Sequence, residues 1–134
     1  MMAPLARSLV RAEEPVLTAQ GLTMWGYSVL LALRDRPARS QAALAASIGA
    51  DKTRLIVTLD DLQERGLIER YPDPADRRVH LLAATPEGRR AAAGTQAQIQ
   101  RQEDELLARL TPADRAVFLR CLEVLSQQKR EDPR

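Results

Sequence analysis

Two short amphipathic segments lie one after the other between residues 40 and 66, and their spacing constrains the fold more than any other feature. Ser40 precedes the first segment and Asp51 the second, and both side chains can accept hydrogen bonds from the free N–H groups of a helix's first turn. Gly49 interrupts the pattern, and Gly66 stands where a helix C-terminus favours a left-handed residue. We expect the residues at helical spacing to be buried: Leu44, Ala45 and Ile48, then Leu55, Ile56, Leu59 and Leu62. The order predicts a helix-turn-helix whose second helix covers Asp51–Arg65.

The periodicity changes after Gly66 from that of a helix to that of strands. Leu67–Tyr71 and Val79–Ala83 are predicted strands, and the sequence Pro-Asp-Pro-Ala-Asp-Arg-Arg separates them. Two prolines and two aspartates in this connection are typical of a loop. We therefore predict a β-hairpin whose tip, Pro72–Val79, forms the wing of a winged helix-turn-helix.

Further helices are predicted on both sides of this central segment. Thr23 is placed to cap the second helix of the chain, and Thr85 and Thr111 are each followed by proline, which favours the first position of a helix. Apolar residues recur at helical spacing behind each of these positions. The predicted ranges are Pro4–Ala19, Met24–Arg34, Thr85–Leu110 and Pro112–Gln128.

The predicted fold class is mainly α with a small β-hairpin wing. The winged helix-turn-helix lobe covers residues 21–85, and N- and C-terminal helical regions, residues 1–20 and 86–134, flank it. An apolar stripe runs along the last helix: Val117, Phe118, Cys121, Leu122 and Leu125. The central lobe is too small to cover the terminal helices, so we expect a second copy of the chain to cover them in a homodimer. Alternatively, these helices fold back onto the central lobe.

Composition narrows the class of function. The 134-residue chain has a net charge of +2 and a pI near 9.1, a slight bias towards polyanionic partners. One cysteine and one histidine leave no intramolecular disulfide, metal-ligand spacing or nucleophile–base pair, so we predict no metal, no cofactor and no enzymatic activity. The sequence has neither a signal peptide nor the roughly 18 apolar residues of a membrane span. We expect a cytoplasmic protein without a membrane partner.

Three stretches, in this order and at this spacing, resemble the MarR family of transcriptional regulators. They are Gly21-Leu22-Thr23 with Val29-Leu30 and Leu33; then Leu44-Ala45, Lys52-Thr53, Leu62 and Arg65-Gly66-Leu67-Ile68-Glu69-Arg70; and last Asp73-Pro74-Ala75-Asp76-Arg77-Arg78-Val79 with Thr85-Pro86-Glu87-Gly88-Arg89. The resemblance implies a homodimer that binds double-stranded DNA at a pseudo-palindromic site, acts as a repressor and is released by a small-molecule effector. The chain departs from the family at Ile56 and Val57, where relatives often have polar residues.

The second helix of the predicted helix-turn-helix must bury one face and present the other to the major groove. The outward residues are Lys52, Thr53, Arg54, Val57 and Thr58. Arg54 can bind the two acceptors of a guanine, and Val57 can contact a thymine methyl group. Lys52 and Thr53 are better placed for phosphate. Alternatively, this is a solvated helix face with ordinary charges.

The resemblance implies that Arg78 enters the minor groove, where narrow A·T-rich sequences attract cations. Asp76 would hold Arg78 in position by a charged hydrogen bond, and Arg77 would contact the DNA beside it. Alternatively, an Asp76–Arg78 bridge only shapes the hairpin. Ser40 and Gln41, at the N-terminus of the first short helix, are expected to contact phosphate.

Members of the family often bind small aromatic or anionic effectors in a crevice between the dimerisation helices and the DNA-binding lobe. Trp25 and Tyr27, on the helix beside that crevice, are the candidate ligand contacts, and core packing is the alternative for Trp25.

We expect His80 to be exposed on the second strand and Cys121 to be packed within its apolar stripe. The alternative function is a winged-helix module that binds another protein and no DNA.

Overall fold

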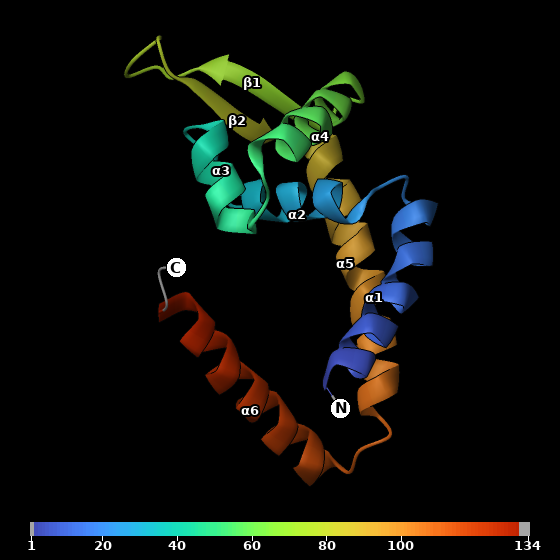
Figure 1. Ribbon diagram of the computed structural model, residues 1–134. Coiled ribbons are helices and arrows are strands. Elements are labelled where there is room, and N and C mark those ends of the chain that lie inside the picture. The colour runs from blue at the N-terminus through green and yellow to red at the C-terminus, as the bar shows by residue number, and fades with distance from the viewer. Residues whose placement is uncertain (1, 132–134) are drawn as a thin grey trace. The chain divides into compact units, whose positions relative to one another are not determined.

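The computed structural model describes residues 2–131 (Figure 1). Its elements in chain order are α1 (Met2–Ala19), α2 (Met24–Leu33), α3 (Gln41–Ile48), α4 (Lys52–Glu64), β1 (Ile68–Pro72), β2 (His80–Ala84), α5 (Pro86–Leu107) and α6 (Pro112–Glu131). The predicted mainly α fold with one hairpin wing is confirmed. Residues 1 and 132–134 of the predicted helical regions lie outside the described residues.

Two compact units divide the chain, one ending at Ile99 and the other beginning at Gln100. The first unit contains the helix-turn-helix and the hairpin. In the second unit, Arg115 Nη2 lies 2.8 Å from Asp104 Oδ1, which ties the start of α6 to the end of α5. All the apolar side chains predicted to form a stripe on α6 are exposed in the single chain. Cys121 is among them, so the expectation that its thiol is packed is wrong for one chain.

Five helices begin where a side chain caps the first turn, as the sequence predicts. Each capping oxygen accepts a hydrogen bond from a backbone N–H three residues later, which replaces a bond that the helix itself cannot supply. The pairs are Thr23 with Gly26 (3.0 Å), Ser40 with Ala43 (3.0 Å), Asp51 with Arg54 (2.8 Å), Thr85 with Gly88 (3.1 Å) and Thr111 with Asp114 (3.2 Å).

Both strands lie one residue later than predicted. The N–H of Leu67 donates to the carbonyl of Leu62 (2.9 Å) and completes the C-terminal cap of α4 behind Gly66, whose φ is +73°. Leu67 therefore belongs to the end of the helix, and β1 starts after it. The N–H of Val79 donates to the carbonyl of Asp76 (3.0 Å), so Val79 belongs to the loop and β2 starts after it.

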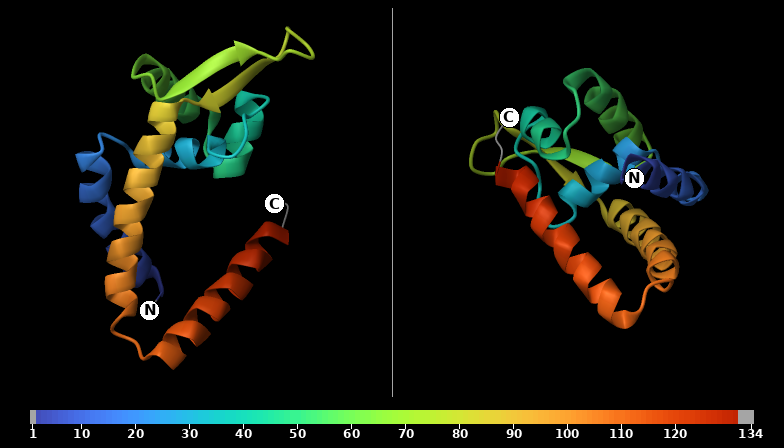
Figure 2. Two further views of the ribbon diagram at one scale, coloured as in Figure 1. Left: turned by 180° about the vertical axis from the view of Figure 1, so that it is seen from behind. Right: turned by 60° about the horizontal axis from the view of Figure 1, so that its bottom comes forward.

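The hairpin is paired on two sides. β1 and β2 are antiparallel, and the register places Ile68 opposite Ala84 and Pro72 opposite His80. On the other edge of β2, Ala38 donates to the carbonyl of Leu82 (2.8 Å) and accepts from its N–H (2.9 Å). The connection between α2 and α3 is thus attached to the hairpin, whose loop protrudes past α3 (Figures 1 and 2).

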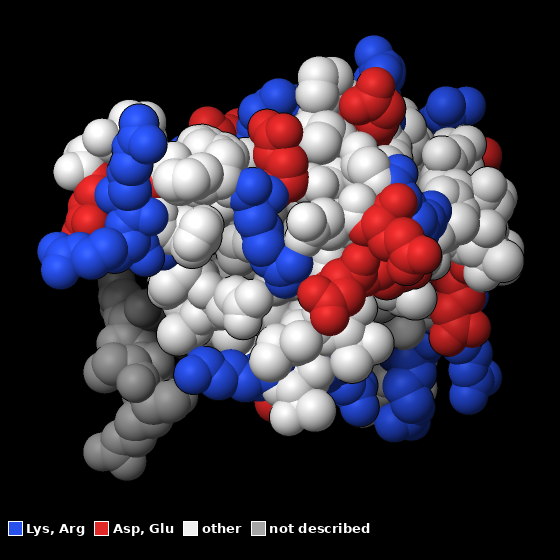
Figure 3. Space-filling model, turned by 90° about the horizontal axis from the view of Figure 1, so that it is seen from above, with Lys and Arg blue, Asp and Glu red and all other residues white. Residues whose placement is uncertain are grey.

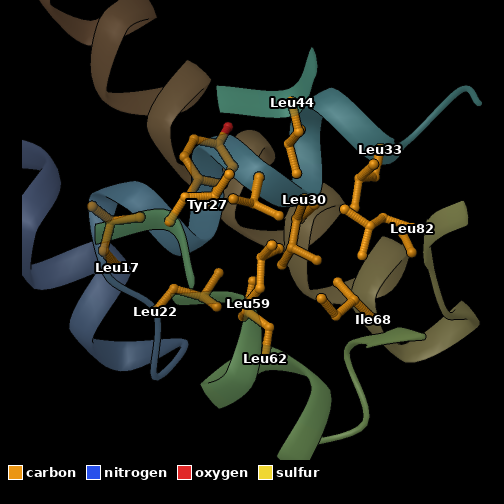
Figure 4. Packing of buried hydrophobic residues seen from close by; sticks show 14 of the residues in the cluster. Leu17, Leu22, Tyr27, Leu30, Leu33, Leu44, Leu59, Leu62, Ile68 and Leu82 are labelled. Atoms are coloured by element: carbon orange, nitrogen blue, oxygen red, sulfur yellow. The ribbon is translucent and has the colours of Figure 1, made fainter. Parts of the chain in front are cut away.

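The core of the first unit is built mostly from leucine, isoleucine and valine, with a few alanines and one tyrosine. α2 lies in its centre, and side chains from α3, α4 and both strands converge on it (Figure 4). Leu30 and Leu59 are fully buried, and a buried side chain of this size contributes about 1.5–3 kcal/mol. Val16 and Leu17 of α1 and Ile99 of α5 extend the same cluster.

The start of α5 is bound to the base of the hairpin. The Thr85 N–H donates to the carbonyl of Leu67 (3.1 Å), and the Thr85 hydroxyl donates to that of Gly66 (2.6 Å). Gly88 lies so close to Leu67, the residue before β1, that an added Cβ would stand 2.0 Å from the Leu67 carbonyl oxygen. Only glycine permits this approach of helix to strand.

The structure corrects further details of the sequence prediction. Ile56 is 42% exposed, because the inward face of α4 is already filled by leucines, so its predicted burial is wrong. Ile48 is only half-buried. The observed ends differ from the predicted ones in that α1 begins at Met2, α2 ends at Leu33, α5 ends at Leu107 and α6 ends at Glu131.

No single helix within residues 2–131 combines the length and the apolar composition needed to cross a membrane. α1 and α2 meet that test only as a pair, across a bend of 79°.

Candidate nucleic-acid interface

The outward face of α4 carries the residues selected from the sequence. Leu55, Leu59 and Leu62 are at most 1% exposed and fix the rotation of the helix. The opposite side presents, on the surface, Lys52, Thr53, Arg54 and Val57. Val57 is 68% exposed, so its apolar side chain is accessible to another molecule.

Two polar residues of α4, Thr58 and Asp61, have partners within the helix or at its C-terminal cap. The Thr58 side chain is half-buried, and its hydroxyl donates to the carbonyl of Arg54 (3.0 Å) within the helix. Its proton is therefore already used, and its acceptor lone pair and methyl group remain for a ligand. Asp61, further along the same face, has its Oδ2 3.5 Å from Arg65 Nη1.

The loop between β1 and β2 is closed by its own aspartates. The Asp73 N–H donates to the carbonyl of Val79 (2.8 Å), and Asp73 Oδ1 accepts from the Ala75 N–H (2.9 Å). These bonds give the exposed tip a defined backbone path. The loop is thus built to hold its arginines in place, although it lies outside the core.

Asp76 and Arg78 form the pair predicted from the sequence. The Arg78 Nε lies 3.1 Å from Asp76 Oδ1 and its Nη2 lies 3.4 Å from Oδ2, so the contact uses both carboxylate oxygens. The Arg78 N–H also donates to Asp76 Oδ1 (3.2 Å). The side-chain bond first, then the backbone bond, lower the pKa of Asp76 below its usual 3.8. The Arg78 side chain is still 91% exposed, and Arg77 is also exposed.

The remaining predicted DNA contacts lie at the N-terminus of α3. Ser40 is exposed, with its hydroxyl oxygen accepting from the Ala43 N–H, and Gln41 is half-buried at the first helical position. In Figure 1, α4 and the hairpin lie at the same end of the first unit, and Figure 3 views that end. Blue Lys and Arg side chains gather at the hairpin end of this face, with red carboxylates beside them.

The two candidate ligand contacts have different environments. Tyr27 is 8% exposed and belongs to the hydrophobic core, whereas Trp25 is half-buried. A cavity of about 250 Å³ lies between α2 and α4, and neither of these aromatic residues lines it. No cluster of three or more His, Cys, Asp or Glu side chains within the described residues is arranged to hold a metal ion.

Comparisons with known proteins decide the family. A sequence model of the MarR family matches residues 20–79. A protein of Thauera aromatica that is named for transcriptional regulation of the hcr operon is 34% identical over 118 residues, which are 88% of this chain and 71% of that protein. The chain belongs to the MarR family. Its relatives are regulators of transcription and not enzymes.

Solved structures of regulators resemble this MarR-family chain over most of its length. CouR from Rhodococcus jostii RHA1, solved with bound p-coumaroyl-CoA, is 28% identical with a TM-score of 0.74, covering 92% of this chain and 87% of CouR. PcaV from Streptomyces coelicolor, in complex with its natural ligand, is 29% identical with a TM-score of 0.67, covering 92% of this chain and 89% of PcaV.

Proposed function

We propose that this MarR-family regulator binds double-stranded DNA as a homodimer at a pseudo-palindromic site, and that it represses transcription until a small effector releases it. The observation that carries the proposal is the wing: Arg78 is almost fully exposed at the tip of a loop, yet a two-point contact with Asp76 holds its guanidinium. An arginine that is both solvent-exposed and held in place is suited to enter the minor groove of DNA once the other contacts have positioned the duplex.

The outward residues of α4 supply the second part of the interface. Arg54 is exposed in the first turn of the helix, where recognition helices contact base edges, and its guanidinium fits the two acceptors of a guanine. Val57 lies one turn further and fits a thymine methyl group. Lys52 and Thr53 bind phosphate, and Thr58 contacts DNA through its methyl group or its lone pair. Asp61 and Glu64 limit the contact to the first half of α4.

Phosphate contacts from α3 and the wing orient the protein on the duplex. Ser40 and Gln41 stand at a helix N-terminus, where the helix dipole and the free N–H groups favour an anion. Arg77 is exposed beside Arg78 and reaches the backbone on the edge of the minor groove. These contacts supply affinity without reading the base sequence.

The proposed dimer covers the exposed apolar side chains of the terminal helices. Within the described residues, they are Met2, Leu5 and Val10 on α1 and Val117, Phe118, Leu119, Leu122, Val124 and Leu125 on α6. So many exposed apolar side chains on one helix, α6, are unfavourable in water and favour an interaction site there. Two-fold symmetry would place the two α4 helices about 34 Å apart, one turn of DNA.

Effector control is proposed from the relatives' ligands. CouR binds a CoA thioester of an aromatic acid, and PcaV binds a natural ligand. The effector of this chain is accordingly a small aromatic or anionic compound. Trp25 is the better of the two candidate contacts, because its half-buried ring is more accessible than that of Tyr27.

The test is a selection of genomic fragments by the purified protein, followed by anisotropy titrations of the selected duplex at several salt concentrations. We expect binding that weakens steeply with salt, with a slope of about −0.9 per phosphate contact. Light scattering should give twice the chain mass in solution. A protein that enriches no fragment and binds no duplex at low salt would contradict DNA binding and favour the protein-interaction alternative.

A further inference from the structure

Arg39 was not among the DNA contacts predicted from the sequence, yet it lies next to two elements of the proposed interface, the hairpin and α3. It directly precedes Ser40, the N-cap of α3. The residue before it, Ala38, is held by two backbone hydrogen bonds to Leu82 of β2. The backbone therefore holds Arg39 in a defined position next to the hairpin. The Arg39 side chain is 75% exposed.

The partner of Arg39 is the aspartate from which the wing loop departs. Arg39 Nη2 lies 3.6 Å from Asp73 Oδ2, and the Asp73 side chain is only 12% exposed. The other oxygen, Oδ1, holds the Ala75 N–H of the loop. One carboxylate thus shapes the loop with one oxygen and faces Arg39 with the other.

The charge of Arg39 also reaches the tip of the wing. After the side-chain and backbone hydrogen bonding from Arg78, the positive charge of Arg39 further lowers the pKa of Asp76. A guanidinium has five N–H donors in one plane, and a single contact at 3.6 Å leaves most of them directed to solvent. Arg39 therefore keeps donors for a second anion while it faces Asp73.

We propose that Arg39 is a third arginine of the DNA-binding surface, which contacts a backbone phosphate beside the N-terminus of α3 while its pairing with Asp73 positions the wing loop. This inference rests on the proposed function. In this role Arg39 couples the two parts of the interface, because a single side chain joins the wing to the phosphate on which α3 is docked.

The experiment measures anisotropy of the selected duplex against salt for Arg39→Ala and Arg39→Lys. Arg39→Ala should weaken binding by about tenfold, and its log K against log salt slope should be less negative by about two per dimer, because one phosphate contact is lost from each protomer. Arg39→Lys should keep the wild-type slope with an intermediate affinity, since lysine retains the charge but not the planar fork. Arg90→Ala is the matched control, because Arg90 is a comparably exposed arginine (72%) with one carboxylate partner, Glu87; its slope should not change.

Asp73→Asn separates positioning from phosphate contact. The amide oxygen can still accept from Ala75, but the ion pair with Arg39 is lost, so affinity should fall while the salt slope stays at the wild-type value. A weaker Arg39→Ala protein with an unchanged slope would overturn the phosphate contact, and an unaffected Asp73→Asn protein would overturn the positioning. If Arg39→Ala binds normally while Arg78→Ala does not, this inference fails and the proposed function stands. A wild-type protein that binds no duplex overturns both.

Discussion

Replacing Gly88 by alanine tests how closely α5 is packed on the hairpin. In a helix interior this substitution usually stabilises by about 0.5–1 kcal/mol, because alanine loses less backbone entropy on folding. Here we expect the opposite sign. The added Cβ would stand 2.0 Å from the carbonyl oxygen and 3.0 Å from the carbonyl carbon of Leu67, and 3.2 Å from Leu30 Cδ2.

The magnitude follows from which atoms obstruct the methyl group. A backbone carbonyl cannot rotate away, so the helix start must move by more than an ångström to restore an ordinary contact. Overpacking of this kind costs about 3 kcal/mol. The shift also breaks the bond from the Thr85 N–H to Leu67, which contributes about 1 kcal/mol. After the helical gain of alanine is subtracted, Gly88→Ala should be destabilised by about 3 kcal/mol.

Urea denaturation followed by circular dichroism measures this effect, with all variants at one protein concentration because dimerisation contributes to stability. The midpoint should fall by about 1–2 M urea. Gly94→Ala in the same helix is the matched control, because its added Cβ would meet only the Gln20 amide oxygen at an ordinary 3.9 Å. That variant should gain about 0.5–1 kcal/mol. A Gly88→Ala protein as stable as wild type would refute the close packing of α5 on β1.

Four further predictions test the caps, the wing and the dimer. Gly66→Ala should lower stability in urea by about 1 kcal/mol, because the φ of +73° strains any residue with a Cβ although the space around it is open; equal stability would contradict the left-handed cap. Arg78→Ala should weaken duplex binding at fixed salt by about tenfold or more, and an unchanged affinity would exclude the wing contact. Above its usual pKa of 3.8, Asp76 is ionised and its pair with Arg78 is fully formed. The pair is lost only as the pH falls through the lower pKa that Asp76 has in the folded protein. Asp76→Asn should therefore weaken binding equally at about pH 5 and about pH 8, and a loss confined to one of them would be inconsistent with that pKa. Leu122→Lys should shift the mass measured by light scattering from dimer towards monomer, and a dimer of undiminished stability would place the interface elsewhere.

Features set by residues a few positions apart were predicted well from the sequence. Each N-cap joins a side chain to an N–H three residues later, so Ser40 and Asp51 were sufficient to mark the starts of α3 and α4. The left-handed conformation of Gly66 and the Asp76–Arg78 pair are equally local. The order of caps and glycines therefore predicted the helix-turn-helix, and the prolines and aspartates between the two predicted strands predicted the wing, before any packing was known.

Features that depend on distant residues were missed or misplaced. Ile56 has the spacing of a core residue, but the leucines of α4 already fill the space against α2, and Ile56 is left at the edge. Arg39 gave no signal because Asp73, its partner, lies far along the chain and approaches only when Ala38 pairs with β2. The burial of Cys121 was expected from its stripe alone, and a single chain does not provide a surface to cover it.

The hydrogen bonds of Thr85 to Leu67 and Gly66 join the first turn of α5 to the residues just before β1, so that the two segments move together as one rigid unit. The hairpin arm that extends from it is five residues long, which at about 3.3 Å per residue is roughly 17 Å. If this rigid unit tilts by about 10°, the far end of the hairpin arm moves by roughly 3 Å. A displacement of this size is several times the spread of about 0.5 Å in hydrogen-bond lengths, so a small reorientation of the first turn of α5 is enough to carry Arg78 into or out of reach of a groove.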